Sequence, residues 1–119
     1  MLLIIEPVGQ RAARSEAEGR QAYAAMQKFG EDLKADGLLV AMESLGSQQR
    51  AARVQRQGGQ TRVIDGPFAE AKEMVGGFFL LNVESREQAL QIAARCPAAE
   101  WCTVEVRDLR PCYDDSLGR

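Results

Sequence analysis

The fold depends on one apolar stretch, Gly76-Gly77-Phe78-Phe79-Leu80-Leu81-Asn82-Val83. Its large apolar side chains would lie on both faces of a β-strand, a pattern typical of a strand that is buried on two sides. The two glycines at its start let the chain bend sharply into the strand. The stretch therefore predicts a central strand that must be covered from both faces.

The sequence before this strand predicts a strand, a long helix, a second strand and a hairpin. Ser15 and Glu18 form the pattern of a capping box at a helix N-terminus, and apolar residues then repeat at helical spacing up to Gly37, a natural stop. Gly58 and Gly59 supply a turn that tolerates positive φ. The predicted elements are strands at 2–6 and 38–42, a helix at 15–37 and a hairpin at 53–63.

The sequence after the central strand predicts a second helix and a last strand. Ser85 with Gln88 marks the start of this helix, and Pro97 marks its end. Residues 102–107 alternate between apolar and polar side chains, as a half-buried strand does. Because residues 110–119 show no periodicity, we divide the chain into one domain at 1–109 and a C-terminal tail at 110–119.

The predicted order of elements is β-α-β-β(hairpin)-β-α-β. Since crossover connections are right-handed, both helices should lie on one face of the sheet, which gives a ferredoxin-like α+β sandwich. The other face would stay uncovered, and the strand at 78–81 would expose a large apolar patch there. Patches of this kind are normally interfaces, so we expect a homodimer that packs sheet against sheet.

Composition and charge exclude several classes of protein. The 119 residues fit a single domain, and 45% apolar residues suffice for one core. The net charge of −2 provides no field that would attract nucleic acid or an anionic membrane, and the arginines at 50–57 have no aromatic residues between them for base stacking. We therefore expect no nucleic-acid and no membrane partner. Because the sequence shows no signal-like or membrane-spanning segment, we expect a cytoplasmic protein.

The residues that usually bind metals are scarce. The chain has no histidine, and Cys96, Cys102 and Cys112 lack the spacing of a C-x-x-C motif. We interpret the three cysteines as small apolar side chains in a reducing compartment. We expect neither a metal site nor a cofactor.

The chain carries a signature just before and into the central strand. It reads Asp65-Gly66-Pro67-Phe68-Ala69-Glu70-Ala71-Lys72-Glu73-Met74-Val75-Gly76-Gly77-Phe78. This run closely resembles the signature of the DGPF-domain family, a branch of the YCII-related superfamily. The sequence at 34–38 and the closing Val104-Glu105-Val106-Arg107 are similar to that family's first helix exit and last strand. The resemblance extends from the first strand to about Leu109 and implies a dimeric ferredoxin-like α+β barrel without an established reaction.

The signature has a structural interpretation. Pro67 suits the first turn of a short helix, with Asp65 or Gly66 in the capping role just before it. The Asp65 carboxylate would then accept the free backbone amides of that turn. Phe68 would point into the core as an anchor.

The same residues also allow a functional interpretation. Four ionisable residues lie within nine positions, close to the predicted dimer cleft: Asp65, Glu70, Lys72 and Glu73. A carboxylate that is partly desolvated there would have a raised pKa and act as a general base, and Asp65 is the candidate. The resemblance to the wider superfamily implies members similar to lyases and dehalogenating enzymes with a His-Asp pair. This chain cannot form that pair, because the matching position lies near Met26, and Tyr23 on the same helix is the only obvious phenol.

The residues leave three functions open. The first is a dimeric module that binds an apolar or anionic metabolite through these residues: Asp65, Phe68, Glu70, Glu73, Glu105 and Arg107. The second is a lyase or isomerase in which Asp65 accepts a proton and Lys72 or Arg107 stabilises an oxyanion, with Tyr23 close by. The third, by analogy with the genomic neighbours of DGPF proteins, is a regulatory partner of an extracytoplasmic-function sigma factor of bacteria.

Overall fold

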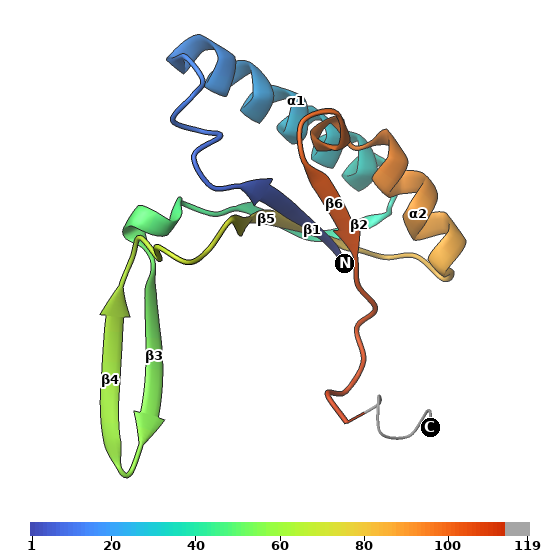
Figure 1. Cartoon of the computed structure of the whole chain (residues 1–119). Coiled ribbons are helices and arrows are strands. Elements are labelled where there is room, and N and C mark those ends of the chain that lie inside the picture. Colours follow the sequence, from blue (N-terminus) through green and yellow to red (C-terminus); the bar gives the residue numbers. More distant parts are fainter. Residues whose placement is uncertain (114–119) are drawn as a thin grey trace.

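A computed structural model describes residues 1–113 of the 119-residue chain (Figure 1). The described part contains strands, two α-helices and two short 3₁₀ helices. In chain order they are β1 (Leu2–Pro7), α1 (Glu16–Ala35), β2 (Leu39–Ser44), η1 (Gln48–Arg50), β3 (Ala52–Gln57), β4 (Gln60–Asp65), β5 (Glu73–Leu81), α2 (Arg86–Arg95), η2 (Pro97–Glu100) and β6 (Thr103–Val106).

Four strands form an antiparallel sheet in the order β2-β5-β1-β6. Both α-helices cover the same face of this sheet (Figure 1). We call the opposite side, which neither α-helix covers, the open face. The architecture is α+β, as predicted, and it is consistent with a ferredoxin-like fold.

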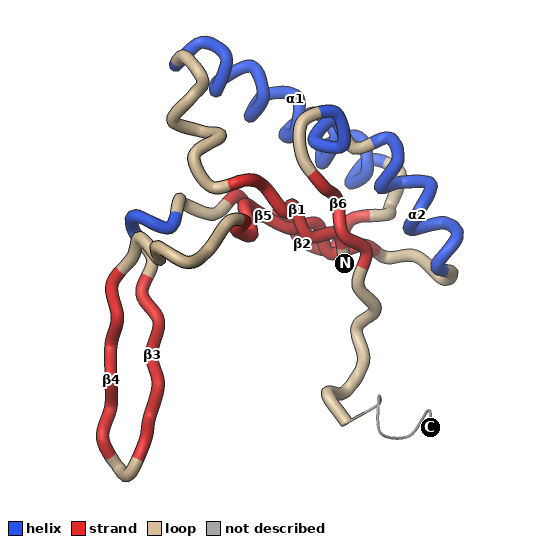
Figure 2. The backbone as a smooth tube through the Cα atoms, viewed as in Figure 1, coloured by secondary structure: helices blue, strands red, loops and turns tan. Residues whose placement is uncertain are grey.

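The predicted hairpin is present but does not belong to this sheet. Strands β3 and β4 pair only with each other, and Gly58 and Gly59 in their turn have φ values of 57° and 78°. The hairpin, residues 52–65, projects from the body of the molecule on the side opposite the helices (Figures 1 and 2). We call it the arm. Its side chains are nearly all exposed, because it stands apart from the four-stranded sheet.

The core lies between the helices and the sheet. Its buried residues come from both helices, from the two strands β1 and β5, and from the turn after α2. They are Leu2, Ile4, Leu33, Phe79, Ile92, Ala93, Cys96 and Ala98. Phe29 of α1 meets Phe79 of β5 edge to face, with ring centroids 5.3 Å apart. The predicted apolar stripe of the first helix is confirmed, since Met26 and Phe29 pack against this core.

Both α-helices begin at the capping residues predicted from the sequence. Ser15 and Glu18 form a reciprocal capping box at the start of α1, and Gly37 follows its end with a φ of 74°. The Ser85 side chain accepts a hydrogen bond from the Gln88 amide at the start of α2. In residues 1–113, neither helix has the length and apolar content needed to cross a membrane.

The segment after the arm differs from its prediction. No helix begins at Pro67: the chain forms an irregular connection in which the Gly66–Pro67 peptide bond is cis. Asp65 is the last residue of β4, and its side chain makes no hydrogen bond within residues 1–113. The predicted capping role of Asp65 is therefore wrong, because no helical turn follows it with free amides to cap. Phe68 is buried, as expected.

Two glycines of the central strand also have a different role from the one predicted. Gly76 and Gly77 lie inside β5 rather than in a bend before it, and Gly76 is the unpaired residue of a bulge opposite β1. A Cβ at Gly76 would collide with the Glu6 carboxylate, and one at Gly77 would come within 2.8 Å of the Glu43 carbonyl oxygen. These positions need glycine because other groups approach the strand closely, not because the chain turns there.

Candidate ligand-binding site

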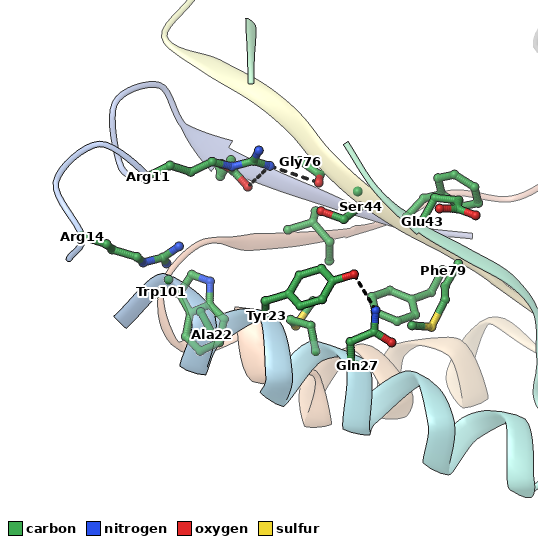
Figure 3. A pocket seen from close by; sticks show the side chains of 17 residues that line it. Arg11, Arg14, Ala22, Tyr23, Gln27, Glu43, Ser44, Gly76, Phe79 and Trp101 are labelled. Atoms are coloured by element: carbon green, nitrogen blue, oxygen red, sulfur yellow. Dashed lines mark hydrogen bonds and ion pairs between the residues drawn. The ribbon is translucent and has the colours of Figure 1, made fainter. Parts of the chain in front are cut away.

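A cavity of about 290 Å³ lies between the first half of α1 and the sheet (Figure 3). Its residues come from β1, the loop at 8–14, α1, the end of β2, the bulged part of β5 and the turn before β6. They are Ile4, Glu6, Arg11, Arg14, Gly19, Ala22, Tyr23, Met26, Gln27, Met42, Glu43, Ser44, Gly76, Gly77, Phe78, Phe79 and Trp101. The buried residues of α1, Gly30 and Leu33, lie in its second half, whereas its first half lines the cavity.

A buried ion pair forms one wall of the cavity. Glu6 is the only charged residue among the buried ones in residues 1–113, and Arg11 donates to it from Nε at 2.6 Å and from Nη2 at 3.3 Å. The same guanidinium also donates to the carbonyl oxygens of Leu45 at 2.7 Å and Gly76 at 3.2 Å. The hydrogen bonds within the protein thus occupy most of the N–H groups of Arg11, and few of them remain for a ligand.

Arg14, unlike Arg11, forms no salt bridge within residues 1–113. Its guanidinium lies over the Trp101 ring, 5.5 Å from the centroid, and no carboxylate of residues 1–113 pairs with it. Gln10 ties down the backbone at Trp101 by donating from Nε2 to the Trp101 carbonyl oxygen at 2.6 Å. Stacking on an aromatic face orients the guanidinium and leaves its N–H groups available to an anion.

The α1 side of the cavity offers one hydroxyl group and several apolar side chains. Tyr23 and Gln27 point from the helix toward the sheet (Figure 3), and Gln27 Nε2 donates to the Tyr23 hydroxyl oxygen at 2.7 Å. That hydroxyl keeps its own proton to donate. The apolar side chains of the lining that lie on the helix side of the sheet are Ile4, Met26, Met42 and Phe79.

The cysteine closest to these groups is not a nucleophile. Burial, and after it the negative charge of Glu6, raise the pKa of Cys102 to about 11. Burial also raises the pKa of Cys96, whose thiol lies 3.8 Å from the Met26 sulfur. Since the thiolate is the reactive form, only about one Cys102 in a thousand is reactive at pH 8.

Alkylation should follow this order. With iodoacetamide at pH 8, we expect the exposed Cys112 to be modified at least about tenfold faster than Cys102 or Cys96, because Cys102 is half-buried, Cys96 is buried, and burial raises the pKa of both thiols. Peptide mapping by mass spectrometry over time measures the three rates. Equal rates at Cys102 and Cys112 would contradict the burial of the former.

Among the site residues predicted from the sequence, only Tyr23 lines this cavity. Phe68 and Glu73 line a second cavity beneath the root of the arm, formed with Ile5, Gln48 and Val75. Asp65 and Lys72 are exposed and line neither of the two. The proton-acceptor role of Asp65 needs a desolvated carboxylate beside a ligand, and its position lends that hypothesis no support.

The other predicted ligand-binding residues are engaged elsewhere. Glu70 accepts a hydrogen bond from Arg53 at 2.8 Å, and a hydrogen bond from its own backbone amide, followed by the Arg53 guanidinium, lowers the pKa of Glu70. Glu105 and Arg107 pair with each other at 3.1 Å around the end of β6, away from the lining of the cavity. The structure therefore does not bring the predicted set together at one site.

Sequence reasoning missed the charged half of the cavity, Glu6, Arg11 and Arg14. For Glu6 a signal existed: with Leu2 and Ile4 it follows the two-residue period of β1, which places it on the core face. A glutamate on a core face requires a partner, and an arginine five residues on could have been proposed. The loop at 8–14 has no periodicity that would place Arg14.

Two comparisons relate the chain to known proteins. A family model described as the YCII-related domain matches residues 2–112. An uncharacterized protein of Rhizobium meliloti (strain 1021) is 46% identical over 43 residues, which are 36% of this chain and 35% of that protein's length.

Proposed function

This chain belongs to the YCII-related domain family, and we propose that it is a small-molecule-binding member of that family. The ligand site is the cavity between α1 and the sheet. The ligand is a compact molecule with one anionic group and an apolar portion. Within the family, we place the chain in the DGPF branch on the run Asp65-Gly66-Pro67-Phe68.

One observation carries the ligand class: Arg14 is held over Trp101 at the cavity and forms no salt bridge with a carboxylate of residues 1–113, the Glu18 carboxylate interacting with it only through space. Hydrogen bonds from a guanidinium to a carboxylate or phosphate are among the stronger polar contacts in proteins. The Glu6–Arg11 pair contributes no net charge, and the Glu43 side chain lies on the open face of β2, so Arg14 determines the sign of the ligand at the Trp101 end of the cavity.

The rest of the cavity limits what the ligand is. Its volume of about 290 Å³ is at the low end of the range for ligand pockets, which suits a small metabolite rather than a nucleotide. Met26, Met42 and Phe79 provide an apolar surface, and the Tyr23 hydroxyl offers one more donor. An aromatic or branched aliphatic carboxylate meets all these conditions.

The test compares the ligand affinity of two variants in which an arginine, Arg14 or Arg20, is replaced by glutamine. A panel of small aliphatic and aromatic carboxylates and phosphates is screened by thermal shift, and hits are titrated by calorimetry. For Arg14→Gln we expect affinity to fall about tenfold or more, because a charged hydrogen bond is lost. Arg20→Gln is the matched control, since Arg20 pairs with Glu16 on the exposed side of α1 and should leave affinity unchanged.

Two results would contradict the proposal. One is a panel in which no anionic compound stabilises the wild-type protein. The other is a hit that binds wild type and Arg14→Gln equally well, which would place its site elsewhere.

We also propose that the chain forms a homodimer through the open face. Phe78 and Leu80 alternate with the buried Phe79 along β5 and therefore point to the side that the helices leave uncovered. Leu3 and Ile5 of β1 alternate in the same way with Leu2 and Ile4. A contiguous apolar face on a four-stranded sheet is the kind of surface that a second subunit covers.

Leu80→Arg should dissociate this dimer. A charge in the middle of an apolar interface loses its hydration without gaining a partner, so we expect a monomer at concentrations where the wild type is dimeric. Leu90→Arg, on an exposed position of α2, is the control and should remain dimeric. Light scattering coupled to size exclusion measures the mass of each, and a wild type that is monomeric at 100 μM would refute the dimer.

A further inference from the structure

The arm presents an apolar pair to solvent. Val54 of β3 and Val63 of β4 are direct cross-strand partners, so their side chains lie next to each other on one face of the hairpin. They are 63% and 60% exposed. A two-stranded hairpin is at best marginally stable in water without packing on one of its faces. The arm therefore has a face that is suited to cover, or to be covered by, another surface.

The root of the arm is fixed to the body of the molecule. The Gly66 amide donates to the Ala51 carbonyl oxygen at 2.8 Å, which closes the base of the hairpin. Arg53 pairs with Glu70 at 2.8 Å and lies over the buried Phe68 ring, 3.7 Å from its centroid. These contacts set the direction of the arm, which extends to the side of the sheet away from the helices (Figures 1 and 2).

The arm and the remainder of the chain carry opposite charge. The arm, residues 52–65, contains three arginines and one acidic residue, Asp65, whereas the other residues include 12 of the 15 basic ones and 16 of the 17 acidic ones. The arm of one molecule is therefore attracted to the body of another. On the open face itself, Glu43 lies opposite Phe78 in the β2–β5 ladder and is exposed.

We propose that the arm clasps a second copy of this chain that is stacked on the open face. Because the arm extends on the open-face side, a molecule that covers this face comes to lie beside the arm. Val54 and Val63 then pack on the second copy, and Arg56, on the same face of the hairpin, meets its acidic surface. This inference rests on the homodimer of the proposed function, and it adds which segment holds the two copies together.

Nucleic acid is a less suitable occupant of the same surface. A phosphate backbone would satisfy the arginines but leave the Val54–Val63 pair without an apolar partner. The arm also has no aromatic residue on which a base could stack. A second copy of the chain satisfies both the charge and the apolar pair.

The experiment removes the apolar pair and then the charge. In Val54→Ser/Val63→Ser we expect the dimer dissociation constant, measured by sedimentation equilibrium, to rise at least tenfold. Arg56→Glu should raise it as well, and added salt should weaken the wild-type dimer more than this variant. Leu90→Ser, at an exposed apolar position on α2, is the matched control and should leave the constant unchanged.

A measurement on the wild-type protein tests the same contact without substitutions that could unfold the arm. In a mixture of isotope-labelled and unlabelled wild-type protein, intermolecular NOEs from the Val54 and Val63 methyl groups to the unlabelled copy are expected. Their absence in a confirmed dimer would overturn the inference.

The outcomes separate this inference from the dimer itself. If Leu80→Arg is monomeric but the arm variants dimerise as tightly as wild type, the arm is not a clasp and the dimer stands. A monomeric wild type overturns both. Binding of a 20-base-pair DNA duplex in 150 mM salt that Arg56→Glu abolishes, with dimerisation unchanged, would assign the arm to nucleic acid instead.

Discussion

Gly66→Ala should lower the free energy of unfolding by about 2–3 kcal/mol, the upper part of the range for forcing an extra methyl group into a packed site. A Cβ at this position would collide with the backbone carbonyl oxygen of Gln48, which no rotamer change can move aside. The Gly66 amide is also tied to the Ala51 carbonyl oxygen at 2.8 Å, so the segment cannot retreat without losing that bond. Urea denaturation at 25 °C measures the loss.

Gly46→Ala is the control for this change. Gly46 lies in the connection on the other side of the arm root, and a Cβ there would meet no atom within 4 Å. We expect a change within about 0.5 kcal/mol, as for other unconstrained surface positions. If Gly66→Ala is equally neutral, the close approach of the two connections at the arm root is wrong.

Phe79→Ala should cost more, about 3–5 kcal/mol, because it removes a buried aromatic side chain and its edge-to-face contact with Phe29. The neighbouring Phe78→Ala is the matched comparison. Phe78 is only partly buried and points to the open face, so its loss should be smaller.

The two variants should also differ in their dependence on protein concentration. Phe79 lies in the core of one subunit, and its loss should be the same at 1 μM and 100 μM. If the chain forms the proposed homodimer, the loss in Phe78→Ala should shrink on dilution, because the interface contributes to stability only while the dimer is populated. Identical concentration dependence would contradict the assignment of the two side chains to opposite faces.

The helices could be predicted because their signals are local. The reciprocal Ser15–Glu18 hydrogen bonds span three residues, and Gly37 ends α1 within one turn, so each is visible in a short window of sequence. The same is true of the Gly58-Gly59 turn of the arm. These elements were correct in type and within two residues at the ends that carry a cap.

The roles of Asp65 and Gly76 could not be predicted, because they depend on distant segments. The sequence around Pro67 is compatible with a helix start, but the chain there is held by a contact with Ala51 and leaves Asp65 at a strand end. Gly76 stands where the Glu6 carboxylate approaches β5, seventy positions away in the chain. An interpretation of the two glycines that uses only their neighbours in sequence predicts a bend and cannot reveal that contact.

The candidate site was the hardest part to foresee. The sequence predicts Tyr23 as the only obvious phenol on the first helix, and Tyr23 does line the cavity. Arg14 and Trp101 come together only because η2 returns the chain to the start of α1. The clustering of ionisable residues at 65–73 pointed to a different place, because neighbours in sequence there do not face one ligand site in space.

The fourfold bonding of Arg11 has a consequence for how fast a ligand binds. One side chain in the loop at 8–14 holds the carboxylate of Glu6 and the carbonyl oxygens of Leu45 and Gly76, so it links β1, the end of β2 and β5 at the entrance of the cavity. The loop that carries Arg14 is thereby fixed before any ligand arrives. Association then needs no prior ordering of this loop, and the free energy that such ordering would cost stays available for affinity.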